Sequence, residues 1–289
     1  MFIRYGYEIT FQCNVDTPII ARLNVHPDRA RDVVFDRPFA SDQVTQSSVF
    51  IDPYGNLSRR FLARAGVTTI VGEGIVNDAG RPDPFVPQAN EWPIQDLPPE
   101  VLPYLLGSRY CETDLLSPLA WQLFGTIAPG WNRVQAICDY VHNQIAFNYQ
   151  FARNTRTALE AQHERVGVCR DYAHLAIAFC RCLNIPARYV NGFLGDIGVP
   201  ADPAPMDFSA WIEVYLGGQW HTFDARHNVP RIGRIVIARG RDAMDVPVLH
   251  SFGTHALQRF KVVTEEAILG TQYAMPPGHR LAPVSMRAA

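Results

Sequence analysis

Cys169 is the residue of this chain whose surroundings best fit nucleophilic chemistry. It follows Gly167 closely and precedes apolar residues at helical spacing, so it is expected to open a helix. A thiol at the start of a helix lies near the positive end of the helix dipole and near free backbone N–H groups. These lower its pKa and are able to hold an oxyanion. The sequence therefore predicts either a nucleophilic thiol or, as for many single cysteines, a small buried apolar residue.

The other cysteines and the nearest histidine fit structural roles. The chain has six cysteines thinly spread over 289 residues, which favours reduced thiols over a disulfide framework. Cys180 and Cys182 lie two residues apart and do not share a helix face, so they cannot bind a metal jointly. His174 lies five residues after Cys169, about 140° around a helix, and is expected to point away from it.

A second group of polar residues lies on a predicted hairpin over residues 210–224, closed by a two-residue Gly-Gly turn. With that turn, Trp211 opposes Asp224 and Ser209 opposes Arg226. The four positions then share one face of the hairpin, with 209 and 224 about 7–8 Å apart on the diagonal.

The first eighty residues are expected to form short strands, with runs at 2–11, 19–25, 45–51 and 67–76. Several short strands separated by turns favour an antiparallel sandwich or barrel. Gly72-x-Gly74 lies in the last of these strands without a third glycine or a following helix, so no dinucleotide-binding fingerprint is present.

Residues 81–112 are predicted to form a proline-rich linker or an extended wrapping arm, because seven prolines lie between positions 81 and 103. Beyond the arm, helical patterns precede strands, which is typical of an α+β domain. The helices are expected at 115–124, 131–145 and 165–183, and the strands at 185–193, 210–224, 232–238 and 257–263. We therefore divide the chain into a β-rich domain (1–80), the arm (81–112) and an α+β unit with a C-terminal strand (113–289).

Composition excludes several classes of protein. A formal charge of −2 gives no electrostatic footprint for nucleic acid, and no apolar run approaches the roughly 18–20 residues of a membrane span. The first residues lack the basic and apolar segments of a secretion signal, so we expect a cytoplasmic protein with no membrane partner. No His/Cys cluster, phosphate loop or Gly-x-Ser-x-Gly turn is present, so we expect no cofactor. The sequence leaves the oligomeric state open.

Five motifs in order resemble the core of the bacterial transglutaminase-like superfamily, whose members are often labelled cysteine proteases. They are GVCRDYAHL (167–175), NIPARYV (184–190), SAWIEVYL (209–216), WHTFD (220–224) and GRDAMDVP (240–247). The resemblance implies a papain-like α+β core, in which the helix that carries the cysteine packs on an antiparallel sheet. An all-β, sandwich-like domain precedes it. By the same resemblance Cys169 is the nucleophile, Asp224 the orienting acid and position 209 the general base.

Position 209 is serine here, whereas the family usually has histidine in a His-Ala-Trp motif. Serine does not titrate near pH 7, so Ser209 neither takes the proton of a thiol nor protonates a leaving amine. One alternative is that His227 supplies the base, which requires the chain to bend after Arg226, because the hairpin register turns His221 to the other face. Another is that Cys169 is activated by the helix dipole alone and handles an activated donor such as a thioester. The third is a non-catalytic protein that binds a peptide or acyl ligand in the cleft.

The resemblance implies cleavage of an amide or thioester, or acyl transfer, through a cysteine acyl-enzyme. The expected partner is a peptide, amide or thioester substrate, contacted by Trp211, Arg226 and Tyr149. Five arginines lie between positions 225 and 241. They either form a patch for an anionic ligand or pair with the neighbouring acids at positions 224, 242 and 245.

Overall fold

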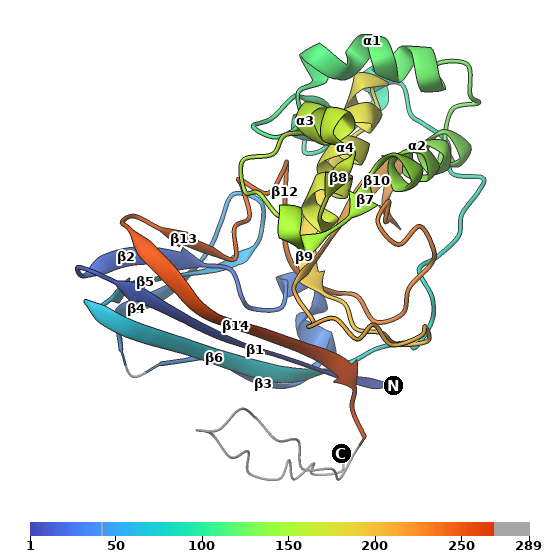
Figure 1. The fold of residues 1–289 in the computed structure, drawn as a ribbon. Coiled ribbons are helices and arrows are strands. Elements are labelled where there is room, and N and C mark those ends of the chain that lie inside the picture. The colour runs from blue at the N-terminus through green and yellow to red at the C-terminus, as the bar shows by residue number, and fades with distance from the viewer. Residues whose placement is uncertain (42, 269–289) are drawn as a thin grey trace.

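The computed structural model describes residues 1–41 and 43–268, and Figure 1 shows a β-rich half beside a half that contains the helices. The strands of the β-rich half are β1 Phe2–Cys13, β2 Thr17–Ala21, β3 Val33–Ala40, β4 Val44–Ile51, β5 Leu57–Ala63, β6 Gly66–Asn77, β13 Leu249–Ser251 and β14 His255–Glu266. They form two four-stranded antiparallel sheets, ordered β14-β1-β6-β3 and β13-β2-β5-β4. The sandwich-like β domain expected from the sequence is thus present, with β3 and β5 in addition to the strands expected.

The last described strand belongs to this β-rich half. β14 runs antiparallel to β1, from Ile3 opposite Glu266 to Cys13 opposite His255, and β13 pairs with β2. The sequence predicts that this strand stays with residues 113–289, but the structure places it at the edge of β1 (Figure 1). Without β14 the 12-residue β1 would have an unpaired edge, which folded proteins avoid.

The proline-rich residues 81–112 form an arm that runs along the helical half rather than a free linker (Figure 1). Two short 3-10 turns interrupt it, Ile94–Asp96 and Leu102–Leu105. Backbone hydrogen bonds hold it in place: the carbonyl of Ala89 accepts from the Trp131 N–H at 3.0 Å, and that of Asn90 from the Gly217 N–H at 2.8 Å. The arm thereby contacts both a helix start and the hairpin turn.

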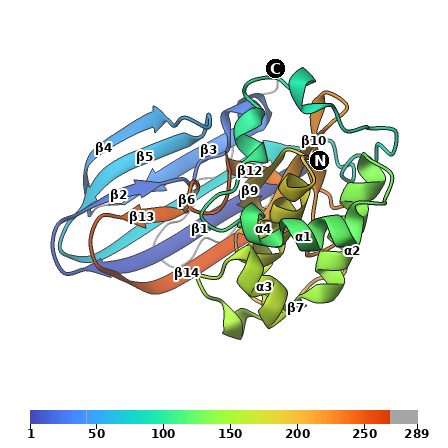
Figure 2. The ribbon, with the colours of Figure 1, turned by 90° about the horizontal axis from the view of Figure 1, so that it is seen from above.

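The other half is an α+β unit in which helices cover one face of a sheet (Figure 2). Its helices are α1 Thr113–Phe124, α2 Trp131–Gln144, α3 Ala158–Glu164 and α4 Cys169–Cys182. Its strands are β7 Ala146–Phe147, β8 Val166–Gly167, β9 Ala187–Phe193, β10 Ser209–Leu216, β11 Gln219–Phe223 and β12 Ile235–Gly240. The main sheet is antiparallel, ordered β11-β10-β9-β12, and α4 packs on β9 and β10 with the other helices around it. This is the α+β arrangement that the sequence predicts.

The hairpin has the predicted register. Leu216 pairs with Gln219 and Ile212 with Phe223, so the strand positions fall on the faces expected from a two-residue turn. The turn residues Gly217 and Gly218 have φ values of 58° and 86°, which residues with side chains rarely adopt.

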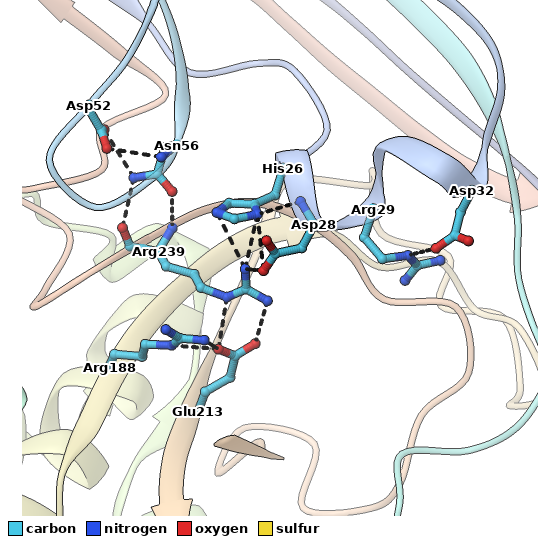
Figure 3. Close-up of polar contacts among 9 residues, drawn as sticks. All are labelled: His26, Asp28, Arg29, Asp32, Asp52, Asn56, Arg188, Glu213 and Arg239. Atoms are coloured by element: carbon cyan, nitrogen blue, oxygen red, sulfur yellow. Dashed lines mark hydrogen bonds and ion pairs between the residues drawn. The ribbon is translucent and has the colours of Figure 1, made fainter. Parts of the chain in front are cut away.

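A polar cluster with His26 and Glu213 buried at its centre joins the two halves (Figure 3), and we call it the inter-sheet network: His26, Asp28, Arg188, Glu213 and Arg239. Glu213 on β10 accepts hydrogen bonds from Arg188 at 2.7 Å and from Arg239 at 2.9 Å. The same Arg239 reaches Asp28 at 2.7 Å and His26 at 3.1 Å in the β-rich half. Burial, together with the charge of Arg239, lowers the pKa of His26 to about 4, so its neutral ring accepts from the guanidinium.

Apolar packing also crosses between the halves. The ring of Tyr5 on β1 lies 4.9 Å from that of Phe193 on β9, within one continuous core.

Across residues 1–41 and 43–268, every helix is too short or too polar to span a membrane.

Candidate active site

Cys169 is the first residue of α4, as the sequence predicts. The carboxylate of Asp171 fixes this helix start, because it accepts the Val168 N–H at 2.8 Å and pairs with Arg156 at 3.0 Å. A Cβ at Gly167 would lie 2.6 Å from that carboxylate, so this position requires glycine. The first amides of a helix have no acceptor within the helix. The Val168 and Asp171 N–H groups are occupied, so those of Cys169 and Arg170 are the ones that the described residues leave for a ligand oxygen.

The Cys169 thiol is enclosed although the residue is partly exposed. Burial raises its pKa to about 11, against the opposing effect of Arg226 and with a further increase from Asp207. The backbone N–H of Ala210 donates to the sulfur and favours the thiolate. The helix start alone predicts a lowered pKa, but desolvation outweighs it, so the resting form is the protonated thiol.

Asp224 and His227 form a hydrogen-bonded pair. Asp224 follows directly after β11, and its Oδ2 lies 2.9 Å from Nδ1 of His227 and 2.9 Å from Arg234. Its Oδ1 accepts the backbone N–H groups of Arg226 at 3.0 Å and His227 at 3.1 Å. Burial would raise the pKa of Asp224, but Arg234 and His227 hold it well below its usual range. The carboxylate is therefore ionised and accepts a hydrogen bond from Nδ1–H of the imidazole, so Nε2 takes no part in this contact.

The chain bends where the His227 alternative requires it. Residues 225–227 form a turn, and Asn228 has a positive φ of 52° with its N–H bound to the Asp224 carbonyl at 2.8 Å. His142 on α2 supports this turn, because its Nδ1 lies 3.2 Å from the carbonyl oxygen of Ala225. No pattern in the sequence points to His142, because only the fold brings α2 against this turn.

Ser209 begins β10 and is 5 % exposed, and its Oγ has no hydrogen-bond partner in the part of the chain that the structure describes. Trp211, which the sequence predicts as a substrate contact, is only 1 % exposed. It packs with Val190 and Val236 in a small cluster of its own. In this structure Trp211 offers no surface to a ligand, and it supports the strand from within.

The predicted polar residues meet at one cavity of about 480 Å³, which we call the Ser209 cavity. Ser209, Arg226, His227 and Tyr149 all line it, together with Asp207. The Cys169 thiol lies near this cavity, within electrostatic range of Tyr149. Burial raises the pKa of Tyr149 to about 12, and Asp207 and the thiol contribute to the increase. Within residues 1–41 and 43–268, the thiol and the His227 imidazole share no hydrogen bond.

Aromatic residues form the rim of the Ser209 cavity. The guanidinium carbon of Arg226 lies 3.9 Å from the ring centroid of Phe147, whose ring contacts Tyr149 edge-on at 4.9 Å. Tyr149 is 40 % exposed, so this rim is open to solvent. The sequence pointed to Arg226 and Tyr149, whereas Phe147 carried no signal before the strand pair β7–β8 was known.

Most of the arginines between positions 225 and 241 are structural. Four of the five make ion pairs: Arg231 with Asp196, Arg234 with Asp83 and Asp224, Arg239 with Glu213 and Asp28, and Arg241 with Asp245. Arg226 is the exception among the described residues. The structure thus agrees with the alternative in which these arginines pair with acids, and a single guanidinium remains at the Ser209 cavity.

His174 is structural, as the sequence predicts. It is fully buried, stacks on Tyr110 with centroids 4.9 Å apart, and accepts the Ala243 N–H at 3.2 Å. All six cysteines are free thiols. In the part of the chain that the structure describes, no three or more His, Cys, Asp or Glu side chains are placed to hold a metal ion.

Comparison with known proteins agrees with this architecture. A profile of the transglutaminase-like superfamily matches residues 119–225. The crystal structure of a putative cysteine protease from Cytophaga hutchinsonii superposes with a TM-score of 0.80 at 30% identity, covering 95% of this chain and 92% of that chain.

Two mycobacterial proteins described as uncharacterized are also similar. One, from Mycobacterium leprae, is 34% identical over 96 residues, which are 32% of this chain and 34% of that protein. The match thus spans about a third of that relative's length. One from Mycobacterium bovis is 27% identical over 220 residues, covering 68% of this chain and 69% of the relative. The chain belongs to the transglutaminase-like superfamily.

Proposed function

We propose that this protein catalyses thiol-dependent acyl chemistry on an amide or thioester, with Cys169 as nucleophile and the Asp224–His227 pair as its base. The observation that carries the proposal is the 2.9 Å bond between Asp224 and His227 Nδ1, which orients an imidazole at the cavity that contains Ser209. This pair supplies the general base, a role that serine at position 209 cannot fill because its hydroxyl does not titrate near pH 7.

The proposed reaction begins with Cys169 Sγ attacking the substrate carbonyl carbon while the thiol proton passes to His227 Nε2. Asp224 stabilises the imidazolium through Nδ1–H, and the free amides at the start of α4 donate to the oxyanion. The imidazolium then gives its proton to the leaving amine or thiol, and the acyl-enzyme remains. Water or an amine attacks that acyl group and regenerates the thiol. Because the resting thiol is protonated, His227 acts as a general base during attack, and Nε2 must reach the sulfur in the substrate complex.

A second candidate is a binding protein that retains the cleft without catalysis. The raised pKa of Cys169, about 11, and serine at the usual histidine position favour it. In this case the peptide or acyl ligand occupies the Ser209 cavity and no covalent adduct forms.

The two candidates differ in whether Cys169 becomes acylated. The protein is incubated with a peptide thioester at pH 7.5, and the adduct is located by intact mass and peptide mass spectrometry. We expect one acyl group on Cys169, released by hydroxylamine, and none in Cys169→Ala. His227→Ala is expected to slow adduct formation by at least tenfold, whereas His163→Ala, which removes an exposed histidine on α3, leaves the rate unchanged.

An adduct absent from Cys169 at every thioester concentration would contradict the catalytic proposal and leave the binding protein. An adduct that forms equally fast in His227→Ala would assign the activation to the helix start alone.

A further inference from the structure

Two carboxylates at the Ser209 cavity lack a cationic partner among the described residues. Of the three aspartates that line it, Asp196 pairs with Arg231 at 3.3 Å, whereas Asp202 and Asp207 make no ion pair. Asp207 Oδ1 accepts only the N–H of Phe208, at 2.6 Å. The cavity is therefore acidic on this side.

The one unpaired cation at the cavity does not compensate both carboxylates. Arg226 stacks on Phe147 at 3.9 Å and forms no ion pair with Asp202 or Asp207 within the described chain. It lowers the pKa of Asp207, whose burial acts in the opposite direction and raises it overall. Two carboxylates thus face one guanidinium.

An independent observation points to a ligand at the same place. Ser209 lines this cavity and is 5 % exposed, and its Oγ finds no hydrogen-bond partner among the described residues. A buried hydroxyl without a partner is costly, and such atoms commonly mark where a ligand or water binds. Ser209 and Asp207 line the same cavity, so a single N–H-rich group placed there has both as candidate acceptors.

We infer that the Ser209 cavity binds a positively charged group of its ligand, an ammonium or a guanidinium, between the Asp207 carboxylate and the Ser209 hydroxyl. The cation is held without reacting. The site thereby selects a substrate with a lysine- or arginine-like side chain beside the acyl group that Cys169 attacks. The inference rests on the proposed function for the identity of that substrate, but the cation site itself does not require turnover. Asp202, exposed at the outer edge, attracts the same charge.

The experiment compares how fast three methanethiosulfonate reagents modify Cys169. The reagents carry a trimethylammonium, a sulfonate or an uncharged methyl group, and each forms a mixed disulfide with the thiol and releases methanesulfinate. Labelling at Cys169 is followed at pH 8 by peptide mass spectrometry, and each rate is divided by the rate for N-acetylcysteine. We expect the cationic reagent to be favoured over the anionic one by about tenfold. Asp207→Asn should lower this ratio at least threefold, and Asp96→Asn, an exposed aspartate outside the cavity, should not change it.

Because the ratio cancels any change in thiol pKa, it reports charge selection alone. A second measurement uses the parent protein and tests the ligand directly. Nα-acetyl-lysine methylamide should slow labelling by the uncharged reagent, and its norleucine analogue should not. The charge ratio is the normalised rate of the cationic reagent divided by that of the anionic reagent. A charge ratio of about one, or equal protection by both amides, would overturn the inference. Failure of thioester acylation with a retained charge ratio would contradict the proposed catalysis and leave the cation site intact.

Discussion

The inter-sheet network and the Ser209 cavity both place buried polar side chains around β10, yet they differ in how these side chains are satisfied. In the inter-sheet network each of the five side chains has partners (Figure 3), and over residues 1–41 and 43–268 none has a buried polar atom without one. In the Ser209 cavity the serine hydroxyl and Nε of Arg231 find no hydrogen-bond partner among these residues.

The difference distinguishes two roles of buried polar side chains, a structural role and a ligand-binding role. A complete network fixes how the two halves of the molecule are oriented, because every charge has its counter-charge within the cluster. An incomplete one has donors and acceptors left over for a ligand. The comparison predicts that substitutions in the first cluster affect stability, and that substitutions in the second mainly affect reactivity and binding.

The largest effect is expected for Glu213→Ala. This change removes the acceptor shared by Arg188 and Arg239, which leaves the largely buried Arg188 without its carboxylate and Arg239 with Asp28 alone. We expect a loss of about 3–5 kcal/mol in the free energy of unfolding, measured by urea denaturation. Glu100→Ala, at an exposed position of the arm, is the control and should change stability by less than about 0.5 kcal/mol. A loss for Glu213→Ala no larger than for this control would show that the network does not hold the halves together.

An intermediate effect is expected for Asp224→Asn, and it depends on pH. The folded-state pKa of Asp224 is lowered, so its charge stabilises the fold above the unfolded-state value near 4, and this contribution is lost as pH falls further. At pH 7 the parent should be more stable than Asp224→Asn by on the order of 2 kcal/mol. Urea denaturation between pH 7 and pH 2.5 should show the difference shrinking below about pH 4. A difference that stays constant over this range would contradict the assigned ion pairs with Arg234 and His227.

The smallest effect is expected for Ser209→Ala. No hydrogen bond is lost, so the free energy of unfolding should change by less than about 0.5 kcal/mol or rise slightly. Asn56→Ala is the contrasting variant, because Asn56 is fully buried and bonds to Asp52 at 3.0 Å and to the Arg239 backbone at 2.8 Å. Its free energy of unfolding should be lower than that of the parent by about 2–3 kcal/mol, measured by the same urea denaturation. Equal losses in the two variants would remove the distinction between a buried polar side chain with hydrogen-bond partners and one without.

The features of the candidate site that depend on local pattern could be predicted from the sequence. The helix start at Cys169 follows from apolar spacing, and the hairpin register follows from a two-residue glycine turn. The bend after Arg226, which the His227 alternative required, is present because the carboxylate of Asp224 accepts the next backbone N–H groups.

The features that depend on long-range packing could not be predicted. The raised pKa of Cys169 arises from enclosure by neighbouring elements, which no local pattern encodes. The burial of Trp211 and the position of Asp207 at the cavity depend on how the loop before β10 folds back. The pairing of β14 with β1 joins strands more than 240 residues apart, and only the open edge of β1 selects it.

The pH profile of iodoacetamide labelling at Cys169 tests the central claim, that the Asp224–His227 pair activates this thiol, most directly. It is measured by peptide mass spectrometry from pH 6 to pH 11 in the parent, His227→Ala, Ser209→His and the control His163→Ala. At pH 7 we expect the parent and the control to react at least tenfold faster than His227→Ala. The profiles should converge near pH 11, where the thiol ionises without help. Ser209→His should shift the profile to lower pH by restoring a histidine at the usual position. Superimposed profiles for the parent and His227→Ala across the whole range would contradict the account.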